Sequence, residues 1–296
     1  MRRGTKTLEH VIKVKNLVKK HKHFLLDNIS FTVPNGFVCG FIGQNGAGKT
    51  TTMKLMLNMT IRNHGEIEIL GKSNDDILVK EDLGVLLDQP YFHDSWTALD
   101  VEKAMSPFYK TWDSKTYHQY LERFSLNPTQ KFKTLSRGMK MKLGLATTLS
   151  HNARLLLLDE PTSGLDPVMR DEMLNILRDY MAVEDRSIFF STHITSDLEK
   201  ISDFIVYIHK GKIIYSGLKE ELLEKYCLIR GGKNDLPTEK RQQIIGIREH
   251  TGGFEGMIDV SDVGGFPSSV IMESATLEDI MVHINKMGHG LGGVNI

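Results

Sequence analysis

The chain has 296 residues, enough for one large α/β domain with a smaller appendage or for two modest domains. Hydrophobic residues make up 40% and charged residues 25%, which are ordinary values for a folded globular protein and exclude a disordered one. The 37 basic and 37 acidic side chains cancel, so no overall charge draws the protein toward nucleic acid or anionic lipid. We therefore expect no nucleic-acid partner.

The apolar segments and the cysteines indicate the cellular compartment in which the protein works. No apolar run approaches the roughly 20 residues that a membrane-spanning helix needs. The first ten residues are polar and basic, without the apolar run that would indicate a signal peptide. Cys39 and Cys227 lie far apart and lack metal-ligand spacing, which fits a reducing cytosol. If the protein serves transport, we expect another chain to cross the membrane.

The first part of the chain changes pattern once. Residues 11–33 contain short apolar stretches broken by a basic cluster, which predicts antiparallel strands at a sheet edge. Residues 37–42 then form a compact apolar run that leads into a glycine-rich loop, and helix-forming residues follow at 51–58. This order predicts a strand, a loop and a helix.

The middle of the chain contains a predicted helical insertion and further strands. Residues 91–150 are rich in aromatics and helix formers, so we expect a mostly helical insertion there. The apolar runs at 155–158 and 187–190 do not alternate with polar residues, as expected of parallel strands covered on both faces. Residues 204–217 predict a hairpin, after which the core closes.

The pattern after residue 217 predicts a small α/β element. A short helical stretch at 220–226 is followed by strand-like residues at 256–260 and 268–272 and by a predicted helix at 277–287. Paired glycines separate these segments. We see no internal repeat or low-complexity tract.

The glycine-rich loop carries the first chemical motif. Residues 43–50, Gly-Gln-Asn-Gly-Ala-Gly-Lys-Thr, match the phosphate-binding loop pattern between a predicted strand and a predicted helix. Its backbone N–H groups can turn inward around phosphate oxygens, Lys49 can reach the β- and γ-phosphates, and Thr50 can hold Mg²⁺. An ordinary glycine turn is the alternative, but the strand-to-helix context favours a nucleotide. The residues predicted to bind it are Gly43, Gln44, Asn45, Gly46, Ala47, Gly48, Lys49, Thr50 and Thr51.

A second motif follows the run at 155–158. Asp159 ends this predicted strand and can hold Mg²⁺, directly or through water. Glu160 beside it can polarise the attacking water, which makes it our predicted general base. Alone, an apolar run that ends in Asp-Glu is more often a strand entering a loop. The phosphate-binding loop upstream favours the catalytic interpretation.

Two further segments resemble those of a known protein family. Leu-Ser-Arg-Gly-Met at 135–139 and Asp-Glu-Pro-Thr-Ser-Gly-Leu-Asp at 159–166 together resemble the ABC ATPase family. The family also has a glutamine between the phosphate-binding loop and the helical insertion, matched by Gln89, and a histidine after a later strand, matched by His193. The resemblance covers about residues 11–217.

The resemblance implies an α/β fold with a particular architecture. We expect a P-loop NTPase with a RecA-like core, an antiparallel β edge and a helical subdomain at about 91–150. The ATP-binding domain should occupy residues 7–217, and residues 218–296 should form a small C-terminal α/β extension. The implied cofactors are ATP and Mg²⁺.

The resemblance also implies a division of labour across a dimer. One chain's phosphate-binding loop holds ATP while Ser136 and Gly138 of a second subunit, identical or homologous, close over the γ-phosphate. Gln89 and His193 join Glu160 as catalytic residues, Gln89 also joins Thr50 and Asp159 at the metal, and Asp166 joins the nucleotide-binding set.

Two positions depart from the family pattern Leu-Ser-Gly-Gly-Gln. Arg137 replaces its first glycine and Met139 replaces its glutamine, whereas the glycine at 138 is kept. Lys140 and Lys142 crowd the same predicted helix start, where cations oppose the helix dipole. A bound polyphosphate would relieve this conflict. The alternative is a solvated basic face.

The adenine-stacking residue has three candidates. The family usually places an aromatic ring upstream of the phosphate-binding loop, and this chain offers His21, His23 and Phe24. His21 lies nearest the expected place. Phe24 is at least as consistent with a buried core position.

The final question is what the ATPase drives. Three segments look like those of ABC-2-type export ATPases: the Leu-Ser-x-Gly-Met-Lys variant at 135–140, residues 108–113 and residues 276–280. Among these ATPases they look most like bacterial ones for antimicrobial or amphipathic peptide export. We therefore expect a cytoplasmic protein on the inner face of the membrane, bound to a transmembrane permease through the aromatic stretch at 90–96. That stretch could instead be subdomain core. The alternative function is a soluble ABC ATPase that acts on ribosomes or in DNA repair.

Overall fold

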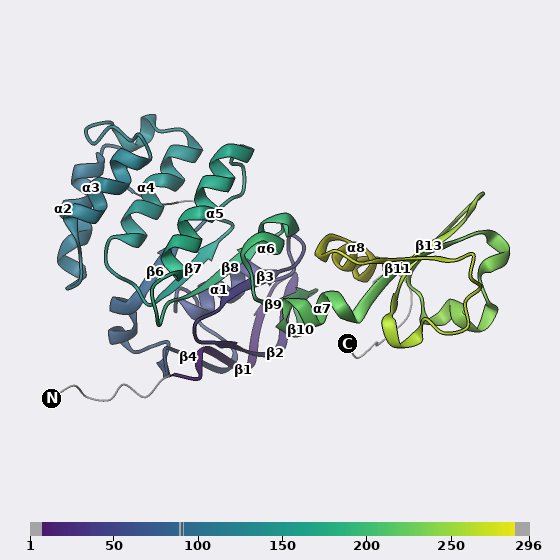
Figure 1. Ribbon diagram of the computed structural model, residues 1–296. Coiled ribbons are helices and arrows are strands. Elements are labelled where there is room, and N and C mark those ends of the chain that lie inside the picture. Colours follow the sequence, from purple (N-terminus) through teal and green to yellow (C-terminus); the bar gives the residue numbers. More distant parts are fainter. Residues whose placement is uncertain (1–7, 89, 91, 288–296) are drawn as a thin grey trace.

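An antiparallel sheet begins the structure, a computed structural model that describes residues 8–88, 90 and 92–287 (Figure 1). β1 (His10–His21) pairs with β2 (Phe24–Pro34) on one side and with β4 (His64–Ile69) on the other. The two-residue β5 (Lys72–Ser73) completes the sheet in the order β2-β1-β4-β5. The predicted antiparallel strands are confirmed.

A six-stranded sheet forms the centre of the molecule. Its order is β10-β9-β3-β8-β7-β6, and all neighbours run parallel except β10, which is antiparallel to β9. The strands are β10 (Lys212–Leu218), β9 (Phe204–His209), β3 (Val38–Ile42), β8 (Ser187–Thr192), β7 (Leu155–Asp159) and β6 (Leu83–Leu86). β3, β7 and β8 are buried at every position, which explains why their apolar runs do not alternate.

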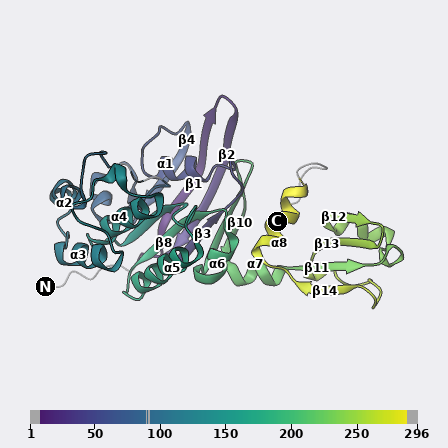
Figure 2. The same ribbon diagram turned by 90° about the horizontal axis from the view of Figure 1, so that it is seen from above.

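Helices cover both faces of this sheet. In β7, Leu155 and Leu157 belong to one hydrophobic cluster, and Leu156 and Leu158 belong to another. The first cluster contains side chains from α1 (Lys49–Met56) and from the antiparallel sheet. The second contains side chains from α5 (Pro167–Met181) and α6 (Thr195–Ile201), which lie on the opposite face (Figure 2).

Three aromatic rings join the two sheets. Phe189 of β8 lies 6.0 Å from Phe31 of β2 and 5.1 Å from Phe41 of β3, measured between ring centroids. Such ring pairs add to the stabilisation that apolar burial provides. They hold the antiparallel sheet against the strand that leads into the phosphate-binding loop.

The predicted helical insertion contains α2 (Ala98–Met105), α3 (Ser114–Arg123) and α4 (Arg137–Leu149). Short 3₁₀ turns, at Ile77–Asp82, Ser106–Phe108 and Phe132–Thr134, precede or link these helices. Side chains at the helix starts accept backbone N–H bonds, as in the capping box that Thr97 forms with Asp100. Tyr117 is fully buried between the helices, and its hydroxyl donates to the carbonyl of Ala98 at 2.9 Å. We call this unit the helical subdomain.

The C-terminal extension begins with α7 (Lys219–Lys225) and contains a third sheet in the order β12-β13-β11-β14. The strands are β12 (Ile245–His250), β13 (Gly253–Asp259), β11 (Tyr226–Gly231) and β14 (Ile271–Ser274), with 3₁₀ turns at Lys233–Asp235, Thr238–Gln243 and Val260–Asp262. The predicted strand at 268–272 is wrong in its bounds, since β14 begins three residues later. The domain boundary at residue 217 stays a prediction.

α8 (Leu277–Met287) returns from the extension to the core (Figure 1). The backbone N–H of Leu277 donates to the Glu199 side chain of α6 at 2.9 Å. Leu277 and Ile280 are fully buried in the same cluster as Leu198 of α6. The extension is therefore packed directly against α6, the helix that follows β8.

The helices are short for membrane crossing. The longest in the described part of the chain, α5, has 15 residues. A span needs roughly 20 apolar residues. Within residues 8–88, 90 and 92–287, no helix has both the length and the apolar character to cross a bilayer.

Replacing Phe189 with alanine should strongly destabilise the core. The change removes a fully buried ring from between two sheets, so the free energy of unfolding should fall by about 3–5 kcal/mol. Urea denaturation followed by circular dichroism measures this. Phe108→Ala, at a ring that is 74% exposed, is the matched control and should change stability by no more than about 0.5 kcal/mol. Equal effects of the two variants would contradict the packing described.

Candidate nucleotide-binding and hydrolysis site

The phosphate-binding loop joins buried strand β3 to α1. Gly48 caps α1 with φ +118°, a backbone conformation that side-chain-bearing residues rarely adopt. At Gly43 a Cβ atom would lie 2.4 Å from the carbonyl oxygen of Ile208, so the loop approaches β9 too closely for any side chain. These two constraints fix the curvature that turns backbone N–H groups toward a bound phosphate.

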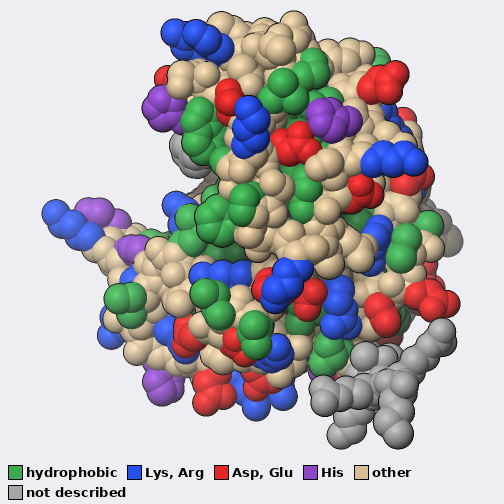
Figure 3. All heavy atoms as spheres, turned by 90° about the vertical axis from the view of Figure 1, so that its left-hand side faces the viewer, with side chains coloured by type: hydrophobic (Ala, Val, Ile, Leu, Met, Phe, Trp, Pro, Cys, Tyr) green, Lys and Arg blue, Asp and Glu red, His purple; other side chains and the backbone are tan. Residues whose placement is uncertain are grey.

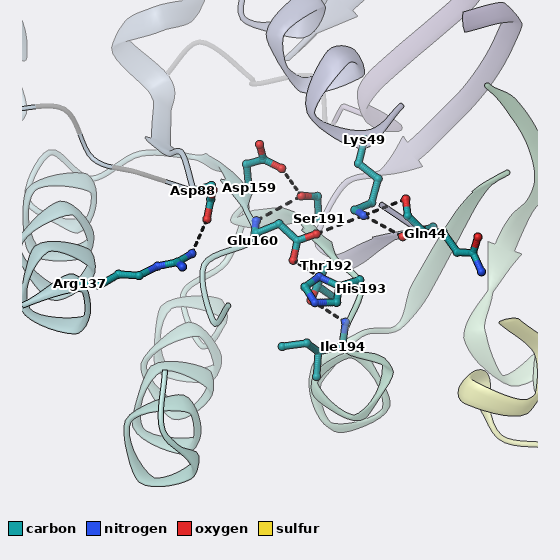
Figure 4. Close-up of polar contacts among 11 residues, drawn as sticks. Gln44, Lys49, Asp88, Arg137, Asp159, Glu160, Ser191, Thr192, His193 and Ile194 are labelled. Atoms are coloured by element: carbon teal, nitrogen blue, oxygen red, sulfur yellow. Dashed lines mark hydrogen bonds and ion pairs between the residues drawn. The ribbon is translucent and has the colours of Figure 1, made fainter. Parts of the chain in front are cut away.

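Lys49 begins α1 and is almost completely buried. Its Nζ donates to the carbonyl of Gly43 at 2.7 Å and lies 3.2 Å from Oε1 of Glu160 (Figure 4). The ammonium group thus links the loop after β3 to the residue after β7. A phosphate group placed at the loop would meet this charge.

Asp159 ends β7 and is 2% exposed. Burial raises the pKa of its carboxyl, and hydrogen bonds from the side chains of Ser191 and Thr50 oppose that rise. The carboxylate and the Thr50 hydroxyl are both hard oxygen donors of the kind that Mg²⁺ prefers. The structure therefore brings together two of the predicted metal ligands.

Glu160 has an unusual backbone conformation, with φ +51°. Its N–H donates to the backbone oxygen of Ser191 at 2.9 Å, which holds it to the end of β8. Its Oε2 lies 2.8 Å from Nδ1 of His193, and its Oε1 faces Lys49 (Figure 4). Backbone strain of this kind concentrates at functional sites. Here it aims the carboxylate between the histidine and the lysine.

Lys49, Thr50, Glu160 and His193 line one cavity of about 750 Å³. Most of the predicted nucleotide-binding and catalytic residues line it, namely Gln44, Asn45, Gly46, Gly48, Lys49, Thr50, Thr51, Glu160, His193 and His21. Asp88, Arg137 and Ser163 also line it, and we did not predict them there. Asp88 and Ser163 adjoin predicted motif residues, so the motifs could have indicated them.

The end of β1, the turn and the start of β2 supply the three candidates for adenine stacking. His21, His23 and Phe24 all line the cavity. Phe24 packs on the loop, because a Cβ atom at Gly48 would lie 2.9 Å from its ring. The geometry does not select one of the three, so the assignment of His21 stays a prediction.

Several predicted residues do not line the cavity of their own chain. Gly43, Ala47 and Asp159 are not among its lining residues, and Gln89 lies outside the described residues. Ser136 caps α4 by accepting the N–H of Met139 at 3.3 Å. Gly138 is partly buried beside Met169, and Asp166 caps α5 by accepting two N–H groups at 3.0 Å each. The roles assigned to them at the nucleotide stay predictions.

Taken together, the loop, the buried aspartate and the paired glutamate and histidine define the site of a P-loop nucleoside triphosphatase. The sequence model of the ABC transporter family matches residues 26–163. The lantibiotic transport ATP-binding protein SrtF of Streptococcus pyogenes is 34% identical over 229 residues, covering 74% of this chain and 98% of SrtF. The chain belongs to the ATP-binding subunits of ABC transporters, and it is an ABC transporter ATPase.

Other relatives agree with this assignment. The bacitracin transport ATP-binding protein BcrA of Bacillus licheniformis is 34% identical over 211 residues, covering 69% of this chain and 68% of BcrA. A solved ATP-binding subunit of an ABC transporter superposes with a TM-score of 0.65 at 24% identity, covering 72% of this chain and 91% of that one. The dimeric cassette MJ0796, bound to ADP and Pi, gives 0.62 at 23% identity, covering 70% and 98%. These structural likenesses support the ABC ATPase fold.

Replacing Glu160 with glutamine should abolish turnover and spare ATP binding. The amide keeps the shape of the side chain but cannot accept the proton of the attacking water, so the ATPase rate should fall by at least about 100-fold. Phosphate release and ATP titration measure the two properties. Glu224→Gln, at an exposed position on α7, is the control and should leave both unchanged. Unchanged turnover in Glu160→Gln would rule out Glu160 as the base.

Proposed function

We propose that this ATPase dimerises around ATP with an identical or homologous subunit and powers a separate transmembrane exporter. The observation that carries the proposal is the position of Ser136. Its side chain is exposed at the start of α4 and does not line the cavity of its own chain. A second chain that presents this helix start would complete the site.

The helix start has the physical character of a phosphate-binding surface. The first N–H groups of a helix lack partners within the helix, and its dipole favours a negative charge there. The neighbouring lysines contribute less than expected, because Lys142 pairs with Glu172 at 3.1 Å and Lys140 lies over the ring of Phe132. The backbone and Ser136 therefore support the proposal more strongly than these lysines do.

Mg²⁺ would be held by Thr50 and Asp159, with Gln89 as a further predicted ligand. Such an ion usually takes one or two protein oxygens and completes its shell with phosphate and water. The described part of the chain contains no cluster of three or more acidic, histidine or cysteine side chains that could hold a metal, which fits a shared site of this kind. Bound Mg²⁺ would neutralise charge on the β- and γ-phosphates.

The residues around the γ-phosphate position would then divide the work. Glu160 accepts the proton of the attacking water, and His193 orients Glu160 through the 2.8 Å contact. Lys49 and the loop N–H groups bind the phosphates. Closure of the dimer on ATP and its reopening after product release give a two-state movement that a permease can use.

A groove between the helical subdomain and the core supports permease docking. It has a volume of about 320 Å³, and the side chains that line it include Met59, Leu87, Phe92, Met105 and Tyr109. On the face that Figure 3 shows, hydrophobic side chains gather where the helical subdomain meets the core. Part of the aromatic stretch is also subdomain core, because Phe92 packs edge to face on Phe132. We propose that a cytoplasmic segment of the permease binds here and holds the protein at the inner face of the membrane.

The relatives guide the proposed cargo. SrtF is named for lantibiotic transport and BcrA for bacitracin transport. We therefore propose export of a peptide, an antibiotic or another amphipathic molecule. A soluble ABC ATPase on ribosomes or in DNA repair is the alternative, and the neutral charge of the chain argues against it.

Cell fractionation tests the exporter proposal. The protein should move to the membrane fraction when the membrane protein encoded beside it is co-expressed, because the permease supplies the docking segment. Tyr109→Asp, which puts a charge into the groove, should lower this recruitment several-fold. Lys115→Asp, at an exposed position in the same subdomain, is the control. RNase-sensitive association with ribosomes, without recruitment by the membrane protein, would favour the alternative.

A further inference from the structure

Arg137 occupies the position where the family pattern has a glycine, and its side chain turns toward its own chain's nucleotide cavity. Its Nη2 atom donates to Oδ1 of Asp88 at 2.8 Å (Figure 4). Asp88 follows the end of β6, so the pair joins the helical subdomain to the core across 49 positions of sequence. Both residues line the cavity that Lys49 and Glu160 also line.

The guanidinium group also lies against the loop that follows Glu160. A Cβ atom at Gly164 would come within 3.1 Å of Nη1 and 3.2 Å of Cζ of Arg137. Gly164 has φ +73°, so its backbone conformation also disfavours a side chain. Arg137 therefore contacts both the loop that follows β6 and the loop that follows Glu160.

The charges at this end of the cavity explain why a cation is needed. Asp88 and Glu160 place two carboxylates in the lining of the cavity, and the buried carboxylate of Asp159 adjoins Glu160 at the end of β7. Among the described residues that line the cavity, Lys49 and Arg137 carry permanent positive charge, and Lys49 already pairs with Glu160.

We propose that Arg137 is a positioning residue that acts through Asp88: it neutralises this carboxylate and holds it away from the phosphates of ATP bound to the same chain. This is a role within one chain, in contrast to the role across the dimer proposed for Ser136 and Gly138. It requires only that the chain binds ATP, so it stands or falls independently of the proposed dimer and permease.

The test measures ATP affinity by calorimetry in the presence of EDTA, which removes the metal ion needed for hydrolysis. Arg137→Gln should weaken ATP binding about tenfold, because Asp88 then repels the phosphates without compensation. Asp88→Asn alone should bind ATP as tightly as the unchanged protein or more tightly. The double variant Arg137→Gln/Asp88→Asn should return to within about twofold of the unchanged protein.

Further measurements separate this role from a structural one. Arg137→Lys keeps the charge and should retain most of the affinity, and the loss in Arg137→Gln should shrink at high salt and be smaller for AMP than for ATP. Arg123→Gln, which removes an exposed ion pair between Arg123 of the helical subdomain and Asp179 of α5, is the matched control and should bind ATP normally. The proposal is overturned if Arg137→Gln binds ATP normally, if the double variant stays as weak as Arg137→Gln, or if Asp88→Asn itself weakens binding. Should Arg137→Gln fail to fold, the charge-exchanged variant Asp88→Arg/Arg137→Asp replaces it. An ATP affinity within about twofold of the unchanged protein supports the proposal, and a loss of about tenfold overturns it.

Discussion

The nucleotide site of this protein depends on the contacts of the Lys49 ammonium group. It bonds the carbonyl of Gly43 and pairs with Glu160, which in turn pairs with His193. Gly43, Glu160 and His193 directly follow the ends of β3, β7 and β8, which are adjacent in the central sheet, and Lys49 begins α1 after the loop. Because the carboxyl ends of parallel strands meet at one edge, three short sequence segments supply one continuous polar chain.

This arrangement creates electrostatic repulsion between carboxylates and phosphates, which other groups in the site must offset. The carboxylates that we predict to serve catalysis and metal binding lie where a highly negative nucleotide would bind. Lysine, backbone N–H groups and the helix dipole offset this repulsion in the phosphate-binding loop. At the far side of the cavity the pairing of Asp88 with Arg137 would do the same. The substitution of Arg137 for the glycine of the family pattern would then have a physical reason within its own chain.

The C-terminal extension is not isolated from this edge. α6 begins two residues after His193, and α8 packs on α6 through Leu277 and Ile280. A second cavity, of about 660 Å³, is lined by Gln44 and His193 on one side and by residues of α8 on the other. The extension therefore borders the loop that carries His193, the predicted catalytic histidine.

The sequence predicted the features that depend on local patterns. The phosphate-binding loop, the Asp159–Glu160 pair and the parallel strands have motifs or fully apolar runs, and each lies where it was predicted. Strands β11 and β12 were missed. β12 has no apolar run and ends in exposed residues, and β11 begins at Tyr226, which lies in the helical stretch predicted at 220–226. The pairing of Arg137 with Asp88 depends on how the helical subdomain folds back on the core, so no local pattern could have indicated it.

The same distinction applies to the candidate site. Residues of one segment, such as Lys49 and Thr50, could be placed from spacing alone. The choice among His21, His23 and Phe24 depends on how a hairpin turn sits above the loop, and all three line the cavity. The roles proposed for Ser136 and Gly138 require a second chain, which a single folded chain does not contain.

The central claim is that ATP is hydrolysed between two chains, and the dependence of turnover on protein concentration tests it most directly. The ATPase rate per chain should rise with concentration as dimers form and should fall toward zero on extreme dilution. Gly138→Asp should keep the rate low at every concentration while ATP still binds. A rate per chain that stays constant at extreme dilution and tolerates loss of Ser136 and Gly138 would contradict the account.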